Sequence, residues 1–233
     1  MENSKYKGRI YERFKNYDKE FTPASSEILF PPYIYKEIKN YLYGNILDVG
    51  TGDGFKLENL LKKCESDKIR NVVAIDPSPL FKIARARFNK YHNIVVQQVS
   101  LEDFYSDQLF DTIFLFDVIE HTYNPKQLME KIISLLKSDG TLIISTPNRP
   151  IYNFTEFLTK RKLDPTHVSV MNFRKFKILM LTYFNKIKIL GILPMMKPGR
   201  KLPFLLKLHK YIAAPPLYNN IICFARYPKK IKE

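Results

Sequence analysis

The sequence is poor in cysteine and has no long apolar run, and each shortage excludes a class of protein. The two cysteines, Cys64 and Cys223, lie far apart and lack the spacing of a metal site, so we predict no metal centre and a reducing compartment. No stretch reaches the ~18 uninterrupted apolar residues that a transmembrane helix needs. Residues 1–16 are charged throughout and lack the apolar core of a signal peptide. We therefore expect a cytoplasmic protein, with peripheral contact to a membrane left open.

Acidic residues are almost absent from the last third of the chain. Residues 1–150 hold 21 lysines and arginines against 20 acids, whereas residues 151–233 hold 17 against 3. This asymmetry carries nearly all of the net charge of +15. It indicates an anionic partner such as RNA, a membrane surface or an acidic substrate. A generally basic surface that binds nothing is the alternative.

Glycine is also scarce, and three of the eight glycines fall within five positions of the segment ILDVGTGDGFKLENLL, residues 46–61. Gly50, Gly52 and Gly54 follow an apolar run and precede a helical pattern. Glycines between a strand and a helix let the backbone approach a ligand closely, and such loops usually hold a nucleotide.

Short apolar runs alternate with helical patterns along most of the chain. The helical patterns lie at about 26–43, 54–63, 79–91, 125–136 and 173–184. We expect strands at 45–49, 72–75, 94–97, 112–116, 141–145, 186–190 and 219–225, with a turn at 138–140. The alternation predicts an α/β fold, a doubly wound, seven-stranded and mostly parallel sheet with helices on both faces.

The chain length and its hydrophobic content of 45% favour one domain, residues 1–233, with two elaborations. Residues 1–43 form an N-terminal flap and a helical cap, in which two prolines disturb the first part of the helix. The core spans 44–192 and 218–228. A basic, proline-broken insert, 193–217, precedes the last strand and contains a short amphipathic helix that could act as a lid.

The glycine loop does not match loops that bind phosphates. A dinucleotide loop needs G-x-G-x-x-G, but here the third glycine comes one residue early and Phe55 stands in its place. No Gly-Lys-Ser/Thr follows, so a P-loop is excluded as well. A pyrophosphate would face Asp48 and Asp53, and like charges a few ångströms apart cost on the order of kcal/mol. The loop therefore favours a cationic nucleoside such as S-adenosylmethionine, whose carboxylate the helix N-terminus at Gly54 could accept.

Five segments follow one another along the chain: LDVGTGDG, VVAIDPSP, VSLEDF, FDTIFLFDVIEHT and LLKSDGTLIISTPN. In this order they resemble the motifs of the class I S-adenosylmethionine-dependent methyltransferases. The fourth segment is similar to the motif of the small-molecule and lipid branch, which includes the quinone-biosynthesis O-methyltransferases. The resemblance covers about residues 40–192 and the last strand, and it implies a Rossmann-like methyltransferase fold.

The resemblance implies a set of cofactor-binding residues. Asp76, at the end of the second strand, would take the ribose hydroxyls, and Ser100, Leu101 and Glu102 would lie at the adenine. Asp48 would reach the methionine ammonium through water, or else it caps a turn. The predicted cofactor-binding residues are Asp48, Gly50, Thr51, Gly52, Asp53, Gly54, Asp76, Pro77, Ser100, Leu101, Glu102, Asp117 and Val118.

Two histidines, His121 and His167, are the candidate catalytic residues. His121 follows the fourth strand, where it would orient the acceptor or act as a general base; the alternative is a histidine bonded to the backbone in a loop. His167 resembles a histidine that the same branch carries after the fifth strand, and it would face the acceptor. Asp117 and Glu120 either line the pocket or cap the next helix. Alignment alone supplies most of the acceleration, and a base is needed only for a hydroxyl acceptor.

The sequence leaves the methyl acceptor open. A small-molecule or lipid-linked acceptor, methylated on oxygen, follows from the fourth motif and the insert. An RNA acceptor is the alternative, because basic and aromatic residues interleave in the last third. A third interpretation is a non-catalytic subunit that binds S-adenosylmethionine. Adenine-type amino methylation is disfavoured, since the segment 116–119 lacks Asn/Asp-Pro-Pro-Tyr.

Overall fold

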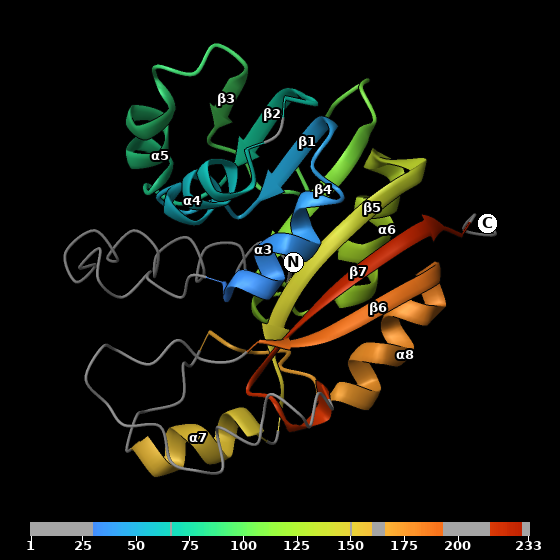
Figure 1. Ribbon diagram of the computed structural model, residues 1–233. Coiled ribbons are helices and arrows are strands. Elements are labelled where there is room, and N and C mark those ends of the chain that lie inside the picture. Colours follow the sequence, from blue (N-terminus) through green and yellow to red (C-terminus); the bar gives the residue numbers. More distant parts are fainter. Residues whose placement is uncertain (1–29, 66, 150, 160–165, 193–214, 230–233) are drawn as a thin grey trace, which may run out of the picture.

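Seven strands form one sheet in the order β3-β2-β1-β4-β5-β7-β6 (Figure 1). The computed structural model describes residues 30–65, 67–149, 151–159, 166–192 and 215–229. The strands are β1 Gly44–Val49, β2 Ile69–Ile75, β3 Ile94–Gln97, β4 Phe110–Phe116, β5 Leu136–Pro147, β6 Phe184–Ile192 and β7 Asn220–Pro228. The first five pair in parallel, and β7 is antiparallel to β5 and β6. The predicted doubly wound, mostly parallel sheet is confirmed.

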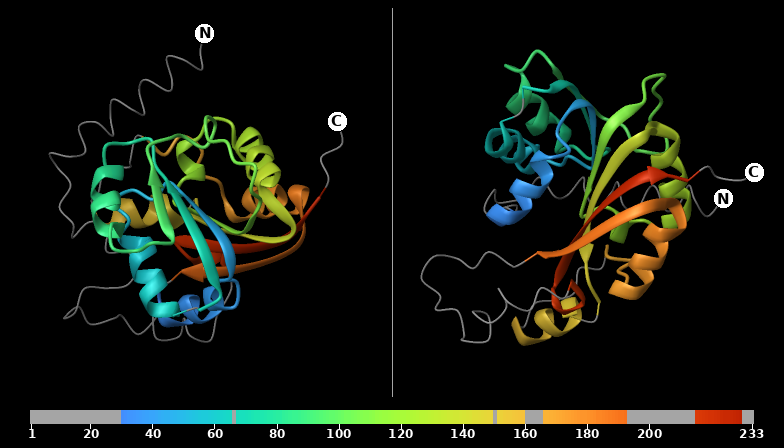
Figure 2. Two further views of the ribbon diagram at one scale, coloured as in Figure 1. Left: turned by 90° about the horizontal axis from the view of Figure 1, so that it is seen from above. Right: turned by 45° about the vertical axis from the view of Figure 1, so that its right-hand side comes forward.

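Helices cover both faces of the sheet (Figures 1 and 2). One face carries α3 (Pro32–Lys39), α4 (Phe55–Cys64) and α5 (Phe81–Phe88), and the other carries α6 (Pro125–Leu135) and α8 (Phe173–Tyr183). A further helix, α7 (Ile151–Thr159), follows β5 and lies beyond the lower end of the sheet in Figure 1.

The central strands are buried on both faces, and successive side chains enter two separate cores. In β1, Leu47 belongs to the core under α6 and α8, whereas Ile46 belongs to the core under α3, α4 and α5. Leu115 and Phe114 of β4 divide in the same way. Burial on both faces explains why these strands read as continuous apolar runs rather than as alternating ones.

Polar caps explain where two of the helices begin. Asn124 Oδ1 accepts a hydrogen bond from the backbone N–H of Gln127 at 3.2 Å, and Pro125 opens α6, where its missing N–H costs no helical bond. Asn172 Oδ1 accepts from Lys175 N at 2.9 Å at the start of α8. These caps fix the two helices that cover the face of β4 and β5.

Several boundaries differ from the prediction by a few residues, and two boundaries and one additional helix have a clear physical reason. The described part of the first helix begins at Pro32, because prolines fit the first turn of a helix and set its start rather than disturb it. β5 begins at Leu136, which pairs with Phe110, so the predicted turn at 138–140 lies inside the strand beside a register shift. Helix α7 was not predicted, because its aromatic and β-branched residues are weak helix formers.

The parallel strands β1, β2 and β4 end together at one edge of the sheet, here called the carboxyl edge. Val49 of β1 pairs with Ile75 of β2, and it also pairs with Leu115 of β4. The loops that follow these three strands contain most of the predicted site residues. The sheet therefore brings together segments that are far apart in the sequence.

Two predicted features lie outside the described residues: the flap, up to residue 29, and the insert from 193 to 214 with its amphipathic helix. The strands that flank this insert meet, since Ile192 of β6 pairs with Asn220 of β7. Within the described ranges, no helix combines the length and the apolar character needed to cross a bilayer.

Candidate functional site

The glycine loop, residues 50–54, joins β1 to α4 at the carboxyl edge. Gly50, Gly52 and Gly54 have φ angles of +74°, +58° and +77°, which strain most other residues. Gly50 also needs its small size, because a Cβ there would lie 2.5 Å from Val118 Cγ2. At Gly52, by contrast, no described atom comes within 4 Å of such a Cβ. The loop thus packs against the end of β4 at one residue and leaves its backbone open two residues later.

Asp76, at the end of β2, holds the glycine loop. Its Oδ2 accepts a hydrogen bond from Gly52 N at 2.7 Å, and its Oδ1 accepts from Ser78 N at 2.8 Å and from Ser78 Oγ. Burial raises the pKa of Asp76, and these three donors oppose the rise. Two carboxylate oxygens offer about four acceptor sites, so capacity for a ligand hydroxyl remains. The role at the ribose stays a prediction.

The two aspartates of the loop stand in different surroundings. Asp48 is buried, and burial raises its pKa to about 6. Asp53 instead accepts a hydrogen bond from Phe55 N at 3.0 Å and lies 3.8 Å from the guanidinium of Arg87. Arg87 offsets the charge of Asp53, so the electrostatic argument against phosphate rests on Asp48. Asp53 also occupies the first amide of α4, which the sequence analysis had assigned to a ligand carboxylate.

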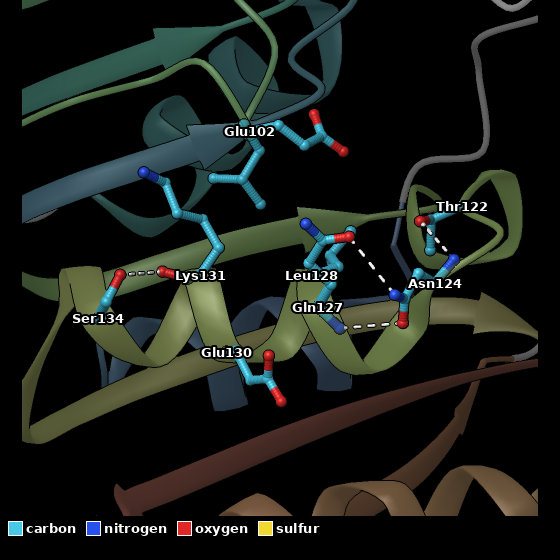
Figure 3. Close-up of a pocket in the computed structure, with 9 residues that line it drawn as sticks. Glu102, Thr122, Asn124, Gln127, Leu128, Glu130, Lys131 and Ser134 are labelled. Carbon is cyan, nitrogen blue, oxygen red and sulfur yellow. Dashed lines mark hydrogen bonds between the residues drawn. The ribbon is translucent and has the colours of Figure 1, made fainter. Parts of the chain in front are cut away.

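The predicted adenine residues follow β3. Ser100 Oγ donates to Asp103 Oδ2 at 2.8 Å and so closes a turn, while Leu101 is buried and Glu102 is exposed. Leu101 and Glu102 border a hollow of about 330 Å³ whose opposite wall is α6. Figure 3 shows Lys131 reaching from this helix toward the side on which Glu102 lies. Pro77 is half-buried beside Asp76. Contact with adenine stays a prediction.

Asp117 follows β4 and faces the start of α4. Its Oδ2 lies 2.6 Å from Lys56 Nζ, and its Oδ1 accepts from Ser145 Oγ at 2.8 Å. Burial acts to raise the pKa of Asp117, but Lys56 and Ser145 outweigh it and hold the pKa below its usual range. The φ of +56° is uncommon for a residue other than glycine, although aspartate tolerates it best among the rest with asparagine.

Glu120 lies three residues beyond Asp117 and has no exposed surface. Its Oε2 accepts from Thr146 Oγ1 at 3.1 Å, and its Oε1 meets no hydrogen-bond partner among the described residues. Burial and the nearby charge of Asp117 raise the pKa of Glu120 well above its usual value, which favours the neutral acid.

The two predicted catalytic histidines meet in the structure. His121 Nδ1 lies 3.2 Å from the carbonyl oxygen of Thr166; a carbonyl only accepts, so Nδ1 carries a proton and Nε2 holds the lone pair of the neutral ring. The rings of His121 and His167 are 4.8 Å apart in an edge-on arrangement, and the ring of Tyr152 lies 5.4 Å from His167. The backbone contact of His121 is the alternative that the sequence analysis had raised.

Glu120, His121 and His167 could also hold a cation. One ligand atom from each residue lies within 4.8 Å of the other two, and imidazole with carboxylate is a common donor set for divalent metals. The sequence analysis predicted no metal site. Close spacing along the chain is the usual signal of a metal site, whereas this cluster joins the end of β4 to a loop 46 positions later.

Sequence reasoning missed Lys56 and gave Tyr152 no role. Lys56 had been given no role, although it stands between Phe55 and Leu57, at a position that faces the carboxyl edge. That break in an apolar pattern, two residues after the last loop glycine, was the available signal. Tyr152 lies on α7, the helix that was not predicted.

Comparison with known proteins identifies the family. A family model described as "Methyltransferase domain" matches residues 12–183. The chain is 32% identical over 120 residues to the mitochondrial ubiquinone biosynthesis O-methyltransferase of Dictyostelium discoideum, covering 47% of this chain and 37% of that protein. It is 32% identical over 152 residues to the ubiquinone biosynthesis O-methyltransferase of Glaesserella parasuis, covering 59% and 61%.

A tRNA U34 carboxymethyltransferase from Alteromonas mediterranea is 29% identical over 110 residues, covering 44% of this chain and 32% of that protein. The chain spans less than two thirds of the length of all three relatives. Among solved structures, N-methyltransferase NodS from Bradyrhizobium japonicum, in complex with S-adenosylhomocysteine, matches with a TM-score of 0.63 at 13% identity, covering 94% of this chain and 98% of that one. A SAM-dependent methyltransferase from Aquifex aeolicus matches with 0.61 at 18%, covering 92% and 98%.

The residues at the carboxyl edge fit the cofactor of this family. A Cβ at Gly52 would meet no described atom, buried Asp48 precedes the loop on β1, and buried Asp76 accepts a hydrogen bond from Gly52 N. Thr51 Oγ1 is buried next to the carboxyl group of Asp48. These groups suit a nucleoside with hydroxyls and a positive charge. The chain therefore belongs to the methyltransferase domain family, which confirms the predicted family and S-adenosylmethionine as its cofactor.

Proposed function

We propose that the protein transfers the methyl group of S-adenosylmethionine to a hydroxyl oxygen of a small or lipid-linked acceptor. The observation that carries this proposal is the imidazole pair of His121 and His167 at the carboxyl edge, beside the loop after β4. A hydroxyl must lose its proton to become a good nucleophile, and a positioned imidazole can accept that proton. S-adenosylmethionine supplies a methyl group already activated by a sulfonium.

The residues around His121 support its role as a base. The carbonyl of Thr166 fixes Nδ1 as the protonated nitrogen and thereby leaves Nε2 with the lone pair. Glu120 packs under this segment as a buried acid, and its backbone carbonyl accepts from Ser169 N at 2.9 Å. The loop of His167 is therefore tied to the end of β4. Two relatives of the chain are named as ubiquinone biosynthesis O-methyltransferases, and they support an oxygen acceptor.

A methyl-label transfer assay tests this function. Wild-type protein with labelled S-adenosylmethionine is offered three fractions separately: small-molecule extract, lipid extract and total RNA. We expect label in the small-molecule or lipid fraction, and the gain should disappear when acceptor hydroxyls are blocked beforehand. Label that appears only in RNA, or on blocked acceptors to the same extent, would contradict the proposal.

Alanine substitutions at two histidines, one in the site and one outside it, test the role of His121. His121→Ala should lower turnover by about 10²- to 10⁴-fold, the usual contribution of a general base, while the affinity for S-adenosylmethionine stays unchanged. His92→Ala changes an exposed histidine after α5 and should leave both quantities unchanged. Full turnover of His121→Ala would reduce that histidine to a structural role.

RNA is the second candidate acceptor. The excess of lysine and arginine in residues 151–233 and the match to tRNA U34 carboxymethyltransferases support it. Phosphate contacts predict an affinity that falls steeply as salt rises. RNA binding that does not respond to salt, or no binding at low salt, would remove this candidate.

Peripheral contact of a cytoplasmic protein with an anionic membrane completes the proposal. Phe154 and Phe157 of α7 expose 59% and 78% of their surface. Helix α7 follows β5, and at the same end of β5 the strand β6 ends and β7 begins, the two strands that flank the basic insert. Apolar side chains next to basic residues suit a lipid surface, where each basic residue adds about 1 kcal/mol. Co-sedimentation with phosphatidylserine vesicles at low salt tests the contact, and failure to sediment would refute it.

A further inference from the structure

One ion pair spans the carboxyl edge. Lys56 Nζ, in the first turn of α4, reaches across to Asp117 Oδ2 at 2.6 Å. The rings of Phe30 and Phe116 lie beside the ammonium, with centroids 5.7 and 5.8 Å from Nζ. The side chains of Lys56 and Asp117 keep 24% and 36% of their surface exposed. A ligand that arrives at the glycine loop can therefore reach both charges.

Asp117 is held in place independently of Lys56. Ser145 Oγ donates to its Oδ1 at 2.8 Å, and its backbone N donates to Ser145 O at 3.1 Å. The left-handed backbone, with φ of +56°, turns the chain at this residue. Strain of this kind persists where surrounding structure enforces it, and it is concentrated at functional sites. The carboxylate would keep its position if the ammonium of Lys56 took another partner.

In the part of the chain that the structure describes, the other positive groups near the loop are already engaged. The guanidinium of Arg87 lies 2.7 Å from Glu58 and 3.8 Å from Asp53, and its Nε donates to Asp53 O at 3.0 Å. The first amide of α4, Phe55 N, donates to Asp53 Oδ1. Lys56, by contrast, pairs with a carboxylate that is partly exposed and is also held by Ser145. Among the described residues, Lys56 is thus the cation best placed to meet an anionic group at this edge.

We propose that Lys56 and Asp117 form a recognition pair for the amino-acid end of S-adenosylmethionine: the ligand's carboxylate takes Lys56, and its ammonium faces Asp117. The inference rests on the proposed function and deepens it. The pair presents one positive and one negative charge side by side, which matches an α-amino acid. An ion pair between side chains that stay partly open to water contributes little stability, so exchanging its partners costs little. A nucleoside without the amino-acid end would leave the ion pair between Lys56 and Asp117 intact.

Binding measurements on three nucleosides test this inference. S-adenosylhomocysteine carries both charges of the amino-acid end, decarboxylated S-adenosylmethionine keeps only the ammonium there, and 5′-methylthioadenosine has neither. Affinities are measured by calorimetry for the wild type, for Lys56→Met and for Asp117→Asn. Lys62→Met is the matched control, because Lys62 is also ion-paired and lies on the outer face of the same helix, 2.8 Å from Glu58.

Lys56→Met should weaken the binding of S-adenosylhomocysteine by about 10- to 100-fold, the usual effect of losing a charge-assisted hydrogen bond. Its affinities for decarboxylated S-adenosylmethionine and 5′-methylthioadenosine should stay within about twofold. Asp117→Asn should weaken the two nucleosides that carry the ammonium and spare 5′-methylthioadenosine. Lys62→Met should change none of the three.

The outcomes separate this inference from the proposed function. If Lys56→Met binds all three nucleosides more weakly to the same degree, Lys56 holds the loop and recognises no carboxylate. If it binds S-adenosylhomocysteine as the wild type does, the inference is overturned while methyl transfer stands. A wild type that binds S-adenosylhomocysteine no better than 5′-methylthioadenosine overturns the inference as well. A wild type that binds none of them overturns both.

Discussion

Strand β4 carries an aspartate at each end, and each aspartate pairs with a lysine. At the amino end, Asp111 Oδ1 lies 2.6 Å from Lys137 Nζ; at the carboxyl end, Asp117 Oδ2 lies 2.6 Å from Lys56 Nζ. The two pairs have the same chemistry and the same length. Their surroundings differ, and the surroundings decide what each pair does.

At the amino end, the sheet uses both oxygens of the carboxylate. Asp111 Oδ2 accepts from Asn45 N at 2.7 Å, beside Gly44, whose missing Cβ makes room for the carboxyl group. The side chain of Asp111 is 11% exposed, against 36% for Asp117. In a parallel sheet, ligands bind beyond the carboxyl ends of the strands. The first pair therefore joins β1, β4 and β5, whereas the second stays within reach of a ligand.

The largest expected effect is at the carboxyl edge. Asp76→Ala removes the acceptor that holds Gly52 N and that we assign to the ribose. Affinity for S-adenosylhomocysteine should fall by about 30- to 1,000-fold, or ~2–4 kcal/mol, measured by calorimetry. Asp107→Ala, on the exposed loop after β3, serves as the control and should bind normally. Unchanged affinity of Asp76→Ala would show that the end of β2 does not meet the ligand.

The same kind of change at the amino end should act on stability instead. Asp111→Ala leaves Asn45 N and Lys137 without their acceptor, so the free energy of unfolding should fall by about 2–3 kcal/mol. Urea denaturation measures the fall, and affinity for S-adenosylhomocysteine should stay within about twofold below the transition. If Asp111→Ala kept full stability but bound S-adenosylhomocysteine weakly, the amino end of β4 would serve binding rather than stability, and the prediction would be wrong.

The pH dependence of stability distinguishes buried Asp48 from ion-paired Asp117. Burial raises the pKa of Asp48 to about 6 in the folded state, so the folded protein binds more protons than the unfolded chain between about pH 4 and 6. The contribution of Asp48 to the unfolding free energy therefore falls as pH rises through this window, by up to about 1.4 kcal/mol per pH unit.

Asp48→Asn should abolish that fall when urea denaturation is repeated at pH 4, 5, 6 and 7. Asp117 should show the opposite sign: its pKa is lowered, so its contribution is present at neutral pH and is lost as pH falls below the usual aspartate range. Identical pH profiles for the wild type and Asp48→Asn would refute the first expectation.

The smallest effect concerns the backbone of the two aspartates. Asp117 has a φ of +56°, which glycine adopts without strain, so Asp117→Gly should be about 1 kcal/mol more stable than Asp117→Ala. Asp111 lies within β4 beside its register shift and has no positive φ, so glycine weakens the strand there and Asp111→Gly should be less stable than Asp111→Ala. Thermal denaturation of the four variants gives the two differences, and equal signs at both positions would contradict the contrast.

The sequence was sufficient for the sheet and for the glycine loop because both follow local patterns. Apolar runs located all seven strands, and β3 matches its predicted range, 94–97. The loop glycines and Asp76 stand where the order of the motifs placed them. Boundaries failed where a distant partner decides them: β5 starts early because Leu136 pairs with Phe110, a contact that local composition does not encode.

The electrostatics of the site depended on partners far away in the chain. Asp48 and Asp53 looked alike in the sequence, but Arg87, 34 positions after Asp53, offsets only the latter. His121 and His167 were both predicted at the acceptor, yet their contact depends on how the loop after α7 returns to β4. Such pairings need the three-dimensional fold, because the charge of one residue says nothing about which neighbour it meets.

The junction of β6 and β7 has a practical consequence for engineering. Gly191 packs against the ring of Tyr218, and its carbonyl accepts from Tyr33 Oη at 2.6 Å. Ile192 pairs with Asn220, so the chain leaves the sheet and re-enters it at neighbouring positions. The connection between these two positions is therefore a place for redesign, and a short hairpin linker there is expected to preserve the pairing of β6 with β7. Variants made in this way would keep the same seven-stranded sheet and differ only in the segment between Ile192 and Asn220.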